Sequence, residues 1–423
     1  MNKPLSLSHS LWQSAGHWKL PISLGLLTIG VYGVASYGFG LLLYDITNTT
    51  GWSVSSMSLA NTLGSIGGAG FGVLAGISLR WISAKKMMSA GLLIGLSAIW
   101  GASLSSTQSS FIICWTVGAS TLQATLYYHI SMALVARKHK NDRAKAFMIL
   151  TLVGGFSSPI FIPLGGLIAS LNDWRFTMQI MSLAAVLFAI PGLLAAPSRP
   201  PVIENIRPDA INNSKESNGR KRGIELLLRN RQLIFITFVF SLSGLVINGI
   251  QFHHVAAIQT FGFSLATAVS ISSARGFLSL PGRAALAYME NQLGTKRALS
   301  CVYTMTLISI LPFLLEPTLP TMWAFGIIGG LGFGTILPLQ GLLASESISD
   351  SNFEASLAAQ QGAALFIGSF GALTFGALYD LTSNYQTVFL TAAAIQLFAI
   401  VLLQFHSRPE RSDSPASDVA ITV

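Results

Sequence analysis

The sequence predicts an all-α membrane protein with twelve transmembrane helices arranged as two six-helix bundles. Three observations lead to this prediction. Hydrophobic residues make up 51% of the 423-residue chain and charged residues only 10%, whereas a typical soluble domain has about 25% charged residues. Twelve apolar runs are each long enough to cross a bilayer. One long polar stretch divides these runs into two sets of six.

The twelve apolar runs define the expected spans, because a membrane-crossing helix needs about 20 mostly apolar residues. The first run is too long for the apolar core of a cleavable signal peptide, which has about 7–15 residues. The expected spans lie at residues 20–44, 54–78, 87–105, 109–135, 144–170, 175–196, 232–257, 263–289, 298–315, 320–344, 354–380 and 385–406.

The stretch from Pro197 to Arg231 is rich in Pro, Asn, Ser and charged residues, which is typical of a linker. Spans five and eleven are weakly similar Gly-rich helices, as expected of secondary transporters built from two related halves. The expected organisation is an N-terminal tail, a first bundle, a linker, a second bundle and a C-terminal tail, at residues 1–19, 20–196, 197–231, 232–406 and 407–423.

Positive charge is distributed very unevenly about the expected spans. With both termini in the cytoplasm, 22 of the 25 Lys and Arg residues fall on the cytoplasmic side. Arg175 falls on the outer side, and Arg275 and Arg283 fall within a span. The positive-inside rule therefore predicts a multi-pass protein of the cell membrane with cytoplasmic termini. The basic clusters are interpreted as topology signals that contact anionic lipid, not as a nucleic-acid-binding surface.

The span from Phe263 to Glu290 is unusual because it contains Arg275 and Arg283 with no Asp or Glu before its last residue. An arginine near the bilayer centre costs roughly 2.5–3.5 kcal/mol on insertion scales. We expect both side chains to face a water-filled or protein-lined cavity. Such a cavity suits an anion in transit.

Three short motifs occur at corresponding positions of a known transporter family. Gly-Trp-Ser at 51–53 opens span two, Asp-Trp-Arg at 173–175 opens span six, and Pro-Gly-Arg at 281–283 lies in span eight. The architecture resembles the major facilitator superfamily, and these motifs resemble its monocarboxylate and oxalate/formate transporter-like branch. The resemblance extends from residue 20 to residue 406 and implies a carrier whose two bundles rock about a midplane site.

The chain departs from this branch in three places. The loop after Gly76 lacks the Asp and second Gly of the superfamily pattern. Ser279 stands where many animal-type members carry an Asp, four residues before the span-eight Arg. Spans one and eleven lack the Lys found in related carriers. Proton coupling therefore stays open.

The resemblance implies that spans one, four, seven and ten line the path. In span seven, polar residues recur at helical spacing, namely Ser241, Gly244, Asn248, Gln251 and His254. Polar side chains in lipid need partners, so this stripe is expected to face inward. Hydrogen bonding between neighbouring helices is the alternative for each of them. Asn248 and Gln251 are the predicted substrate contacts.

Tyrosines mark the path-facing sides of spans one and four. Tyr37 follows the spacing of Gly33 and Gly40, and Tyr32 lies off that face. Tyr127 and Tyr128 are about 100° apart on a regular helix, so only one is expected to face the path. Packing between helices is the alternative role.

Span ten contains Gln340, and span eleven contains Gln360 and Gln361. Each glutamine can donate hydrogen bonds to an oxygen-rich ligand, and packing is an equal alternative for all three. Gln361 is the predicted substrate contact among them.

Two histidines within spans are candidates for proton coupling. His129 and His254 can titrate near neutral pH; a hydrogen bond to a backbone carbonyl is the alternative for His129. No His/Asp/Glu spacing indicates a metal site. Cys114 and Cys301 lie in apolar runs and form no disulfide framework, and no cofactor is expected.

The sequence thus predicts a monomeric secondary transporter for a small organic anion, most simply a carboxylate. Arg283 is the predicted anchor, because a planar guanidinium binds a carboxylate bidentately, and Arg275 is the predicted second contact. An ion pair with Asp45 or Asp380 is the alternative for Arg283. No Gly-x-x-x-x-Gly-Lys motif is present, so gradients must supply the energy. The alternatives are an efflux pump for drug-like compounds and a non-transporting sensor; an enzyme is not expected.

Overall fold

The fold comes from a computed structural model that describes residues 7–200, 225–315, 317–348 and 353–406. Side-chain positions are described for these ranges except at residues 7–16, 284, 287, 354 and 355. The expected C-terminal tail and most of the expected linker lie outside the described residues. Within the described part, all regular structure is helical.

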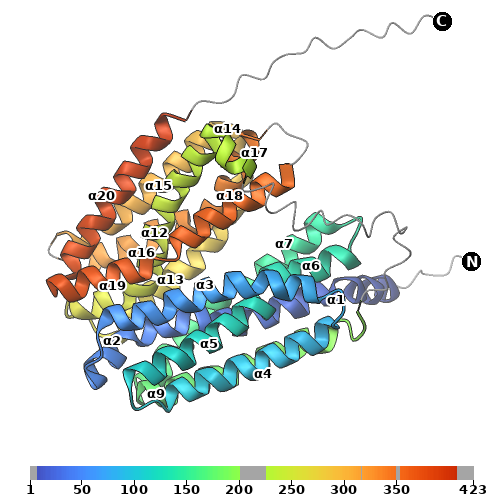
Figure 1. The fold of residues 1–423 in the computed structure, drawn as a ribbon, viewed down its shortest axis with the longest axis horizontal. Helices are drawn as coiled ribbons and strands as arrows, with labels where there is room; N and C mark the ends of the chain where they lie inside the picture. Colours follow the sequence, from blue (N-terminus) through green and yellow to red (C-terminus); the bar gives the residue numbers. More distant parts are fainter. Residues whose placement is uncertain (1–6, 201–224, 316, 349–352, 407–423) are drawn as a thin grey trace, which may run out of the picture.

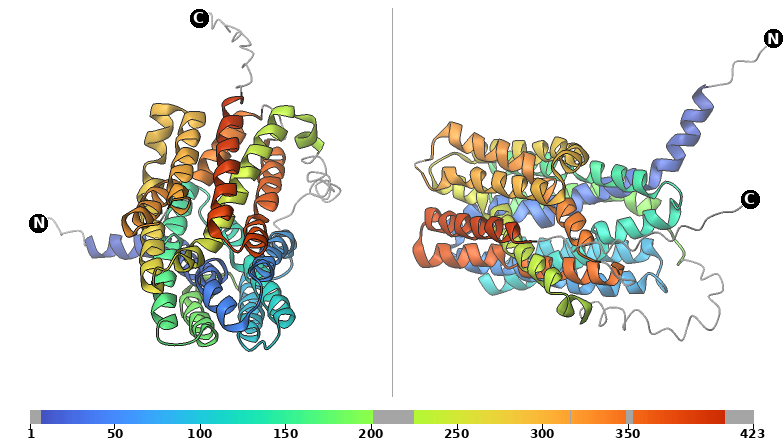
Figure 2. Two further views of the ribbon diagram at one scale, coloured as in Figure 1. Left: turned by 90° about the vertical axis from the view of Figure 1, so that its left-hand side faces the viewer. Right: turned by 90° about the horizontal axis from the view of Figure 1, so that it is seen from above.

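The first bundle begins earlier than the first expected span, because helix α1 starts ahead of residue 20 and projects from the bundle (Figure 2). Its elements are α1 Leu7–Tyr32, the π-helical segment η1 Gly33–Gly38, α2 Phe39–Thr50, α3 Val54–Ser78, α4 Ala84–Ser103, α5 Gln108–Leu126, α6 Tyr128–Lys138, α7 Arg143–Gly154, α8 Ser157–Ala169 and α9 Trp174–Ala195.

The second bundle repeats the arrangement of six antiparallel spans. Its elements are α12 Arg231–Thr260, α13 Leu265–Ala284, α14 Leu286–Leu293, α15 Thr295–Ile310, the 3-10 turn η2 Leu311–Phe313, α16 Leu319–Phe333, α17 Ile336–Glu346, α18 Phe353–Gly368, α19 Gly371–Thr382 and α20 Tyr385–Gln404.

Eight of these helical segments are long and apolar enough to cross a membrane by length and composition. The other four expected spans are present as α4, the pair α5 and α6, the pair α13 and α14, and α15, packed among the eight. The predicted fold class, twelve transmembrane helices in two six-helix bundles, is confirmed.

Polar side chains at the short turns start many of the helices. An N-cap side chain accepts a hydrogen bond from a free N–H of the first turn. The N-caps that do so are Ser53, Ser83, Thr107, Asp173, Asn230, Ser264, Thr318 and Asn384.

Several spans are interrupted near their middle. Tyr127 is extended, with φ −78° and ψ 176°, and separates α5 from α6. Span one contains the π-helix η1, and span ten breaks at Gly334 and Thr335. Non-helical backbone at membrane depth is tolerated where it is buried in protein or lines a cavity. Of the four spans expected to line the path, three are therefore interrupted, and span seven, α12, is continuous.

The two bundles contact each other at one end of the molecule and diverge at the other (Figure 1). We call the end with the turns at residues 51–53, 170–173 and 383–384 the far end, and the opposite end the linker end. The extensive contacts between bundles are α3 with α19, α2 with α12, and α8 with α13. Within the described part, α6 and α7 form no comparable contact with α14, α17 or α18.

The hydrophobic core shows the same asymmetry. One continuous cluster runs through the first bundle and into the far-end half of the second, joining residues such as Phe39 and Phe252. A separate cluster around Leu299 and Leu339 fills the linker-end half of the second bundle. The structure is therefore closed at the far end and open toward the linker end.

Candidate functional site

Arg275 lies on α13 and is held entirely by residues of the second bundle. Its Nη1 donates a hydrogen bond to Oε1 of Gln251 on α12, at 3.0 Å. Its guanidinium carbon is 4.7 Å from the ring centroid of Phe333 and 5.7 Å from that of Phe325. The side chain is only 7% exposed, and its Nε has no hydrogen-bond partner among the residues that the structure describes. Cation–π contacts and one amide thus hold a buried charge.

Arg283 lies two turns farther along α13 and reaches the first bundle. Its side chain is exposed, and Nη1 donates to the backbone carbonyl of Thr151 on α7, at 3.4 Å. The guanidinium also lies close enough to the Tyr128 hydroxyl to interact with it electrostatically. Gly334 lies against this side chain, since a Cβ at that position would be 2.8 Å from the Arg283 Cγ. Arg283 is therefore positioned at the boundary between the bundles.

Neither arginine has an acidic partner within the part of the chain that the structure describes. The described ion pairs join His17 to Asp142 and Arg229 to Glu225. The suggested alternative partner Asp380 instead accepts hydrogen bonds from backbone N–H groups at the far end.

Three tyrosines form a ring cluster on the first bundle beside Arg283. The Tyr32 and Tyr127 rings stack with centroids 3.9 Å apart, and the Tyr128 ring lies 5.2 Å from Tyr32. The Tyr127 hydroxyl is hydrogen-bonded to Ser36 at 2.7 Å. The break at Tyr127 removes the 100° offset of a regular helix. Both Tyr127 and Tyr128 therefore face Tyr32, which sequence reasoning had placed off this face.

Tyr37 lies between the two groups of residues. It is half-buried and close enough to Arg275 and to Tyr128 to interact with both electrostatically. The first bundle thus supplies aromatic rings and hydroxyls, and the second bundle supplies the cations. An anion with an apolar body matches this combination.

The polar residues of span seven have different environments in the structure. Gln251 binds Arg275, as described above. Asn248 is exposed and donates to the Gly244 carbonyl of its own helix at 2.9 Å. Ser241 is buried and bonded to the Thr237 carbonyl. Of these three residues, Gln251 therefore contacts an arginine, Asn248 is exposed and Ser241 is buried in its helix.

The glutamines of spans ten and eleven have three different environments. Gln361 is exposed beside Gly341. Gln340 is buried and donates to the Tyr303 hydroxyl at 2.7 Å, which is a packing role. Gln360 is fully buried, and its amide has no partner in the described part of the chain.

The histidines considered for proton coupling both bond backbone carbonyls. His129 Nε2 is 3.0 Å from the Ala124 oxygen, and His254 Nδ1 is 2.8 Å from the Ile250 oxygen. His129 is exposed and distant in sequence from the arginine helix, whereas His254 is buried and shares the Phe325 ring with Arg275. No group of three or more metal-ligating side chains occurs among the described residues.

Sequence reasoning missed Phe333, the Thr151 carbonyl and the far-end residue His253. His253 follows Phe252 directly and bonds Ser58 of the first bundle. No sequence signal marks a backbone carbonyl as a partner. His253 could have been singled out from the sequence, because it is a second histidine next to His254 within an apolar span.

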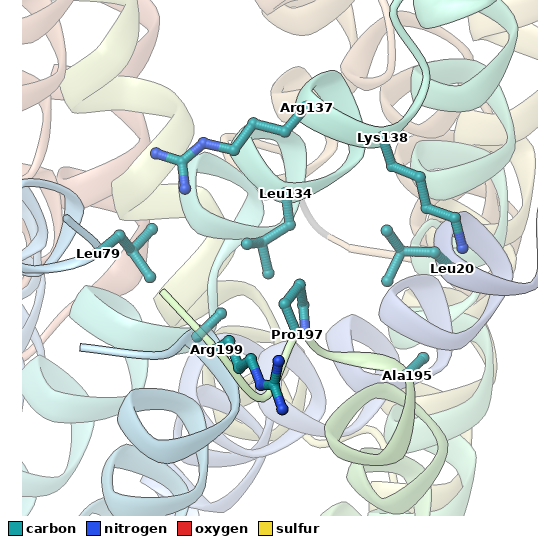
Figure 3. Close-up of a pocket in the computed structure, with 9 residues that line it drawn as sticks. Leu20, Leu79, Leu134, Arg137, Lys138, Ala195, Pro197 and Arg199 are labelled. Atoms are coloured by element: carbon teal, nitrogen blue, oxygen red, sulfur yellow. The ribbon is translucent and has the colours of Figure 1, made fainter. Parts of the chain in front are cut away.

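One cavity of the first bundle is separate from the arginines. It has a volume of about 330 Å³ and lies at the linker end of the first bundle (Figure 3). Leu20, Leu79 and Leu134 line its apolar part, and Arg137, Lys138 and Arg199 are its basic residues. A second space of about 10 Å³ near Trp115 is apolar. Neither contains Arg275 or Arg283.

The family follows from a comparison with protein-family models. The model described as Major Facilitator Superfamily matches residues 25–291 and 255–421. The chain belongs to the Major Facilitator Superfamily. It is therefore a multi-pass membrane protein and a secondary transporter, not an enzyme. No curated protein matches the chain.

Solved structures of superfamily transporters share the fold at low sequence identity. A mutant of the nucleoside transporter NupG has a TM-score of 0.80 and 14% identity, covering 92% of this chain and 99% of its own. A D-xylose-proton symporter has a TM-score of 0.71 and 16% identity, covering 93% and 98%. A mutant of the peptide transporter POT has a TM-score of 0.71 and 11% identity, covering 92% and 93%. These likenesses concern the fold alone.

Proposed function

We propose that this superfamily member transports a small organic anion, with a carboxylate as the group that it recognises. The observation that carries the proposal is the pair of guanidinium groups on α13. Neither has a carboxylate partner among the described residues, and one of them touches the opposite bundle. A membrane protein tolerates such charges where they face a water-filled cavity or a ligand.

The two arginines suggest an order of events. Arg283 is exposed toward the open linker end, so it meets the anion first and binds it with charge-assisted hydrogen bonds. The Tyr128 hydroxyl and the nearby rings contact the remainder of the ligand. Pairing lowers the cost of excluding water from Arg283. The linker end can then close while Arg275 provides the deeper positive charge.

The motif resemblance to the monocarboxylate and oxalate/formate transporter-like branch supports the same substrate class. The charge distribution supports a cytoplasmic linker end, which orients the present structure as open to the cytoplasm. The expected bundle boundaries and a monomeric state belong to the same proposal. A proton as co-substrate would have His254 as its nearest histidine carrier, since Ser279 replaces the acidic residue found in relatives.

A thermal-shift screen tests the substrate class directly, because a ligand that binds the folded state raises the melting temperature. Purified protein is heated with mono- and dicarboxylates, sugars, nucleosides and cationic drugs. We expect stabilisation by carboxylates, followed by counterflow of the radiolabelled hit in proteoliposomes. Stabilisation and flux with neutral or cationic drugs alone would establish the efflux alternative. Binding without counterflow would establish a sensor.

A further inference from the structure

The far end contains a hydrogen-bonded contact that joins the bundles through the backbone. Asp380, near the end of α19, accepts hydrogen bonds from two N–H groups of the first turn of α3. The Val54 nitrogen is 3.1 Å from Oδ1, and the Ser55 nitrogen is 2.8 Å from Oδ2. One carboxylate of the second bundle thus caps a helix of the first.

This capping completes the first turn of α3. The first four N–H groups of a helix lack partners within it. At α3, the Met57 N–H already makes the first bond within the helix, to the Ser53 carbonyl, and the Ser53 side-chain oxygen accepts from the Ser56 N–H. Asp380 accepts from the two N–H groups between them, those of Val54 and Ser55. Separation of the bundles at the far end would leave both groups, and the carboxylate, to water.

The contact continues inward along α3 and α19. His253 on α12 lies 3.2 Å from the Ser58 hydroxyl and 2.9 Å from the Ala372 carbonyl. The backbones approach closely at Gly376, where a Cβ would lie 2.3 Å from the Ser58 hydroxyl. Thr62 donates to the Ser369 carbonyl at 3.2 Å. Polar groups therefore bridge the bundles over more than one turn.

We propose that Asp380 is a positioning residue of the transport cycle, which stabilises the far-end-closed state by capping α3 across the two bundles. Negative charge is favourable at a helix N-terminus, and charge-assisted hydrogen bonds are stronger than neutral ones. Both contributions exist only while the far end is closed. The inference does not depend on the substrate that the protein carries.

Two sets of variants remove this interaction from opposite sides. Asp380→Ala removes the carboxylate, and Asp380→Asn removes its charge while keeping one acceptor oxygen. Val54→Pro removes one donor N–H at the first helical position, where proline is well tolerated. The preceding Ser53 has φ −67° and ψ 146°, a conformation that suits a following proline. Val54→Ala keeps the N–H and controls for the lost side chain.

A matched control at the same end is Asp173→Ala. Asp173 caps α9 by accepting from the Phe176 N–H at 2.8 Å, within the first bundle. This variant loses the same kind of interaction but no contact between bundles.

The readout is the distance between spin labels on full-length protein in nanodiscs, in a Cys114→Ser, Cys301→Ser background. A far-end pair carries labels at the exposed positions Leu171 and Leu315, one on each bundle. A linker-end pair carries labels at the exposed positions Trp81 and Leu293.

We expect Asp380→Ala and Val54→Pro to lengthen the far-end distance and shorten the linker-end distance in a larger share of molecules. The ratio of the two states should change roughly tenfold, the scale of a single charge-assisted hydrogen bond. Asp380→Asn should change this ratio less, because the asparagine keeps one acceptor oxygen. Asp173→Ala and Val54→Ala should leave both distributions in place.

Unchanged distributions in Asp380→Ala and Val54→Pro would overturn the proposal. A broader far-end distance distribution without a shorter linker-end distance would also overturn the proposal. That result would show local loosening of the far end and no rotation of one bundle against the other. Equal shifts in Asp173→Ala would assign the effect to helix capping in general.

Discussion

Arg275 and Arg283 occupy the same helix, yet their surroundings differ in almost every respect. Arg275 is buried, and its hydrogen bond and cation–π contacts are with Gln251 and two phenylalanine rings of the second bundle. Arg283 is exposed and reaches across to the first bundle, where it donates to the Thr151 carbonyl and lies near Tyr128. The first environment holds a charge in place, and the second leaves a charge available.

The difference shows how one residue type can serve two steps of a transport cycle. A contact within a bundle survives rocking, because the bundle moves as a unit. A contact between bundles must break or be replaced when the bundles move. Arg283 therefore senses both the ligand and the state of the carrier, whereas Arg275 provides a constant positive charge.

Replacement of Arg283 is expected to have the largest effect. Arg283→Ala should abolish carboxylate flux in proteoliposomes, because the anion loses its first charged partner. Arg283→Lys should restore flux only partly, since an ammonium cannot form the bidentate pair. Expression and melting temperature should stay near those of the wild type, because the side chain is exposed. Undiminished flux in the alanine variant would remove the anchor assignment.

Replacement of Arg275 should separate function from stability. Arg275→Met removes a buried charge that has no acidic partner, and such replacements are often neutral or stabilising. We expect flux to fall about tenfold, equivalent to about 1.4 kcal/mol, with an unchanged or higher melting temperature. Both quantities are measured on one preparation. A lower melting temperature with normal flux would make Arg275 a structural residue.

The Tyr127 and Tyr128 hydroxyls should differ in importance, because only that of Tyr128 lies beside Arg283. Tyr128→Phe removes the hydroxyl that interacts with Arg283. We expect the KM for a carboxylate to rise about fivefold, the scale of one neutral hydrogen bond of about 1 kcal/mol. Tyr127→Phe loses only the bond to Ser36 and should change KM less. Equal effects would mean that both rings act as one packed unit.

A buried polar pair remote from both arginines provides the smallest expected effect on flux. Tyr303→Phe leaves the Gln340 amide without its 2.7 Å partner inside the second bundle. The loss should destabilise the protein by about 1–3 kcal/mol and lower the melting temperature, with flux per folded molecule unchanged. Thermal unfolding and flux measured together check this. A large loss of flux would instead indicate that the transport path includes residues of span nine.

Much of the architecture followed from local patterns. Apolar runs, a polar linker and the asymmetry of Lys and Arg depend on the cost of placing polar groups in lipid, which each segment meets by itself. Arg275 and Arg283 were conspicuous for the same reason. The Tyr37, Asn248 and Gln251 assignments rested on helical spacing, and the Gln361 assignment on its capacity to donate hydrogen bonds; the structure places only some of them near the arginines.

The contacts between segments that are distant in the sequence could not be predicted from local patterns. The stacking of Tyr32 on Tyr127 and Tyr128 depends on a break in span four that no proline or glycine announces. The capping of α3 by Asp380 joins residues 326 positions apart.

The sequence by itself therefore determined the class of protein, the number of spans and the presence of unpaired positive charge within the membrane. Solvation energy is a property of each residue and its near neighbours, so hydropathy and charge report it without a fold. Only the tertiary structure decided which arginine is buried, which side chains meet across the bundles and which end is closed. Those features depend on how the two bundles pack against each other, and that packing is not encoded in any single stretch of the chain.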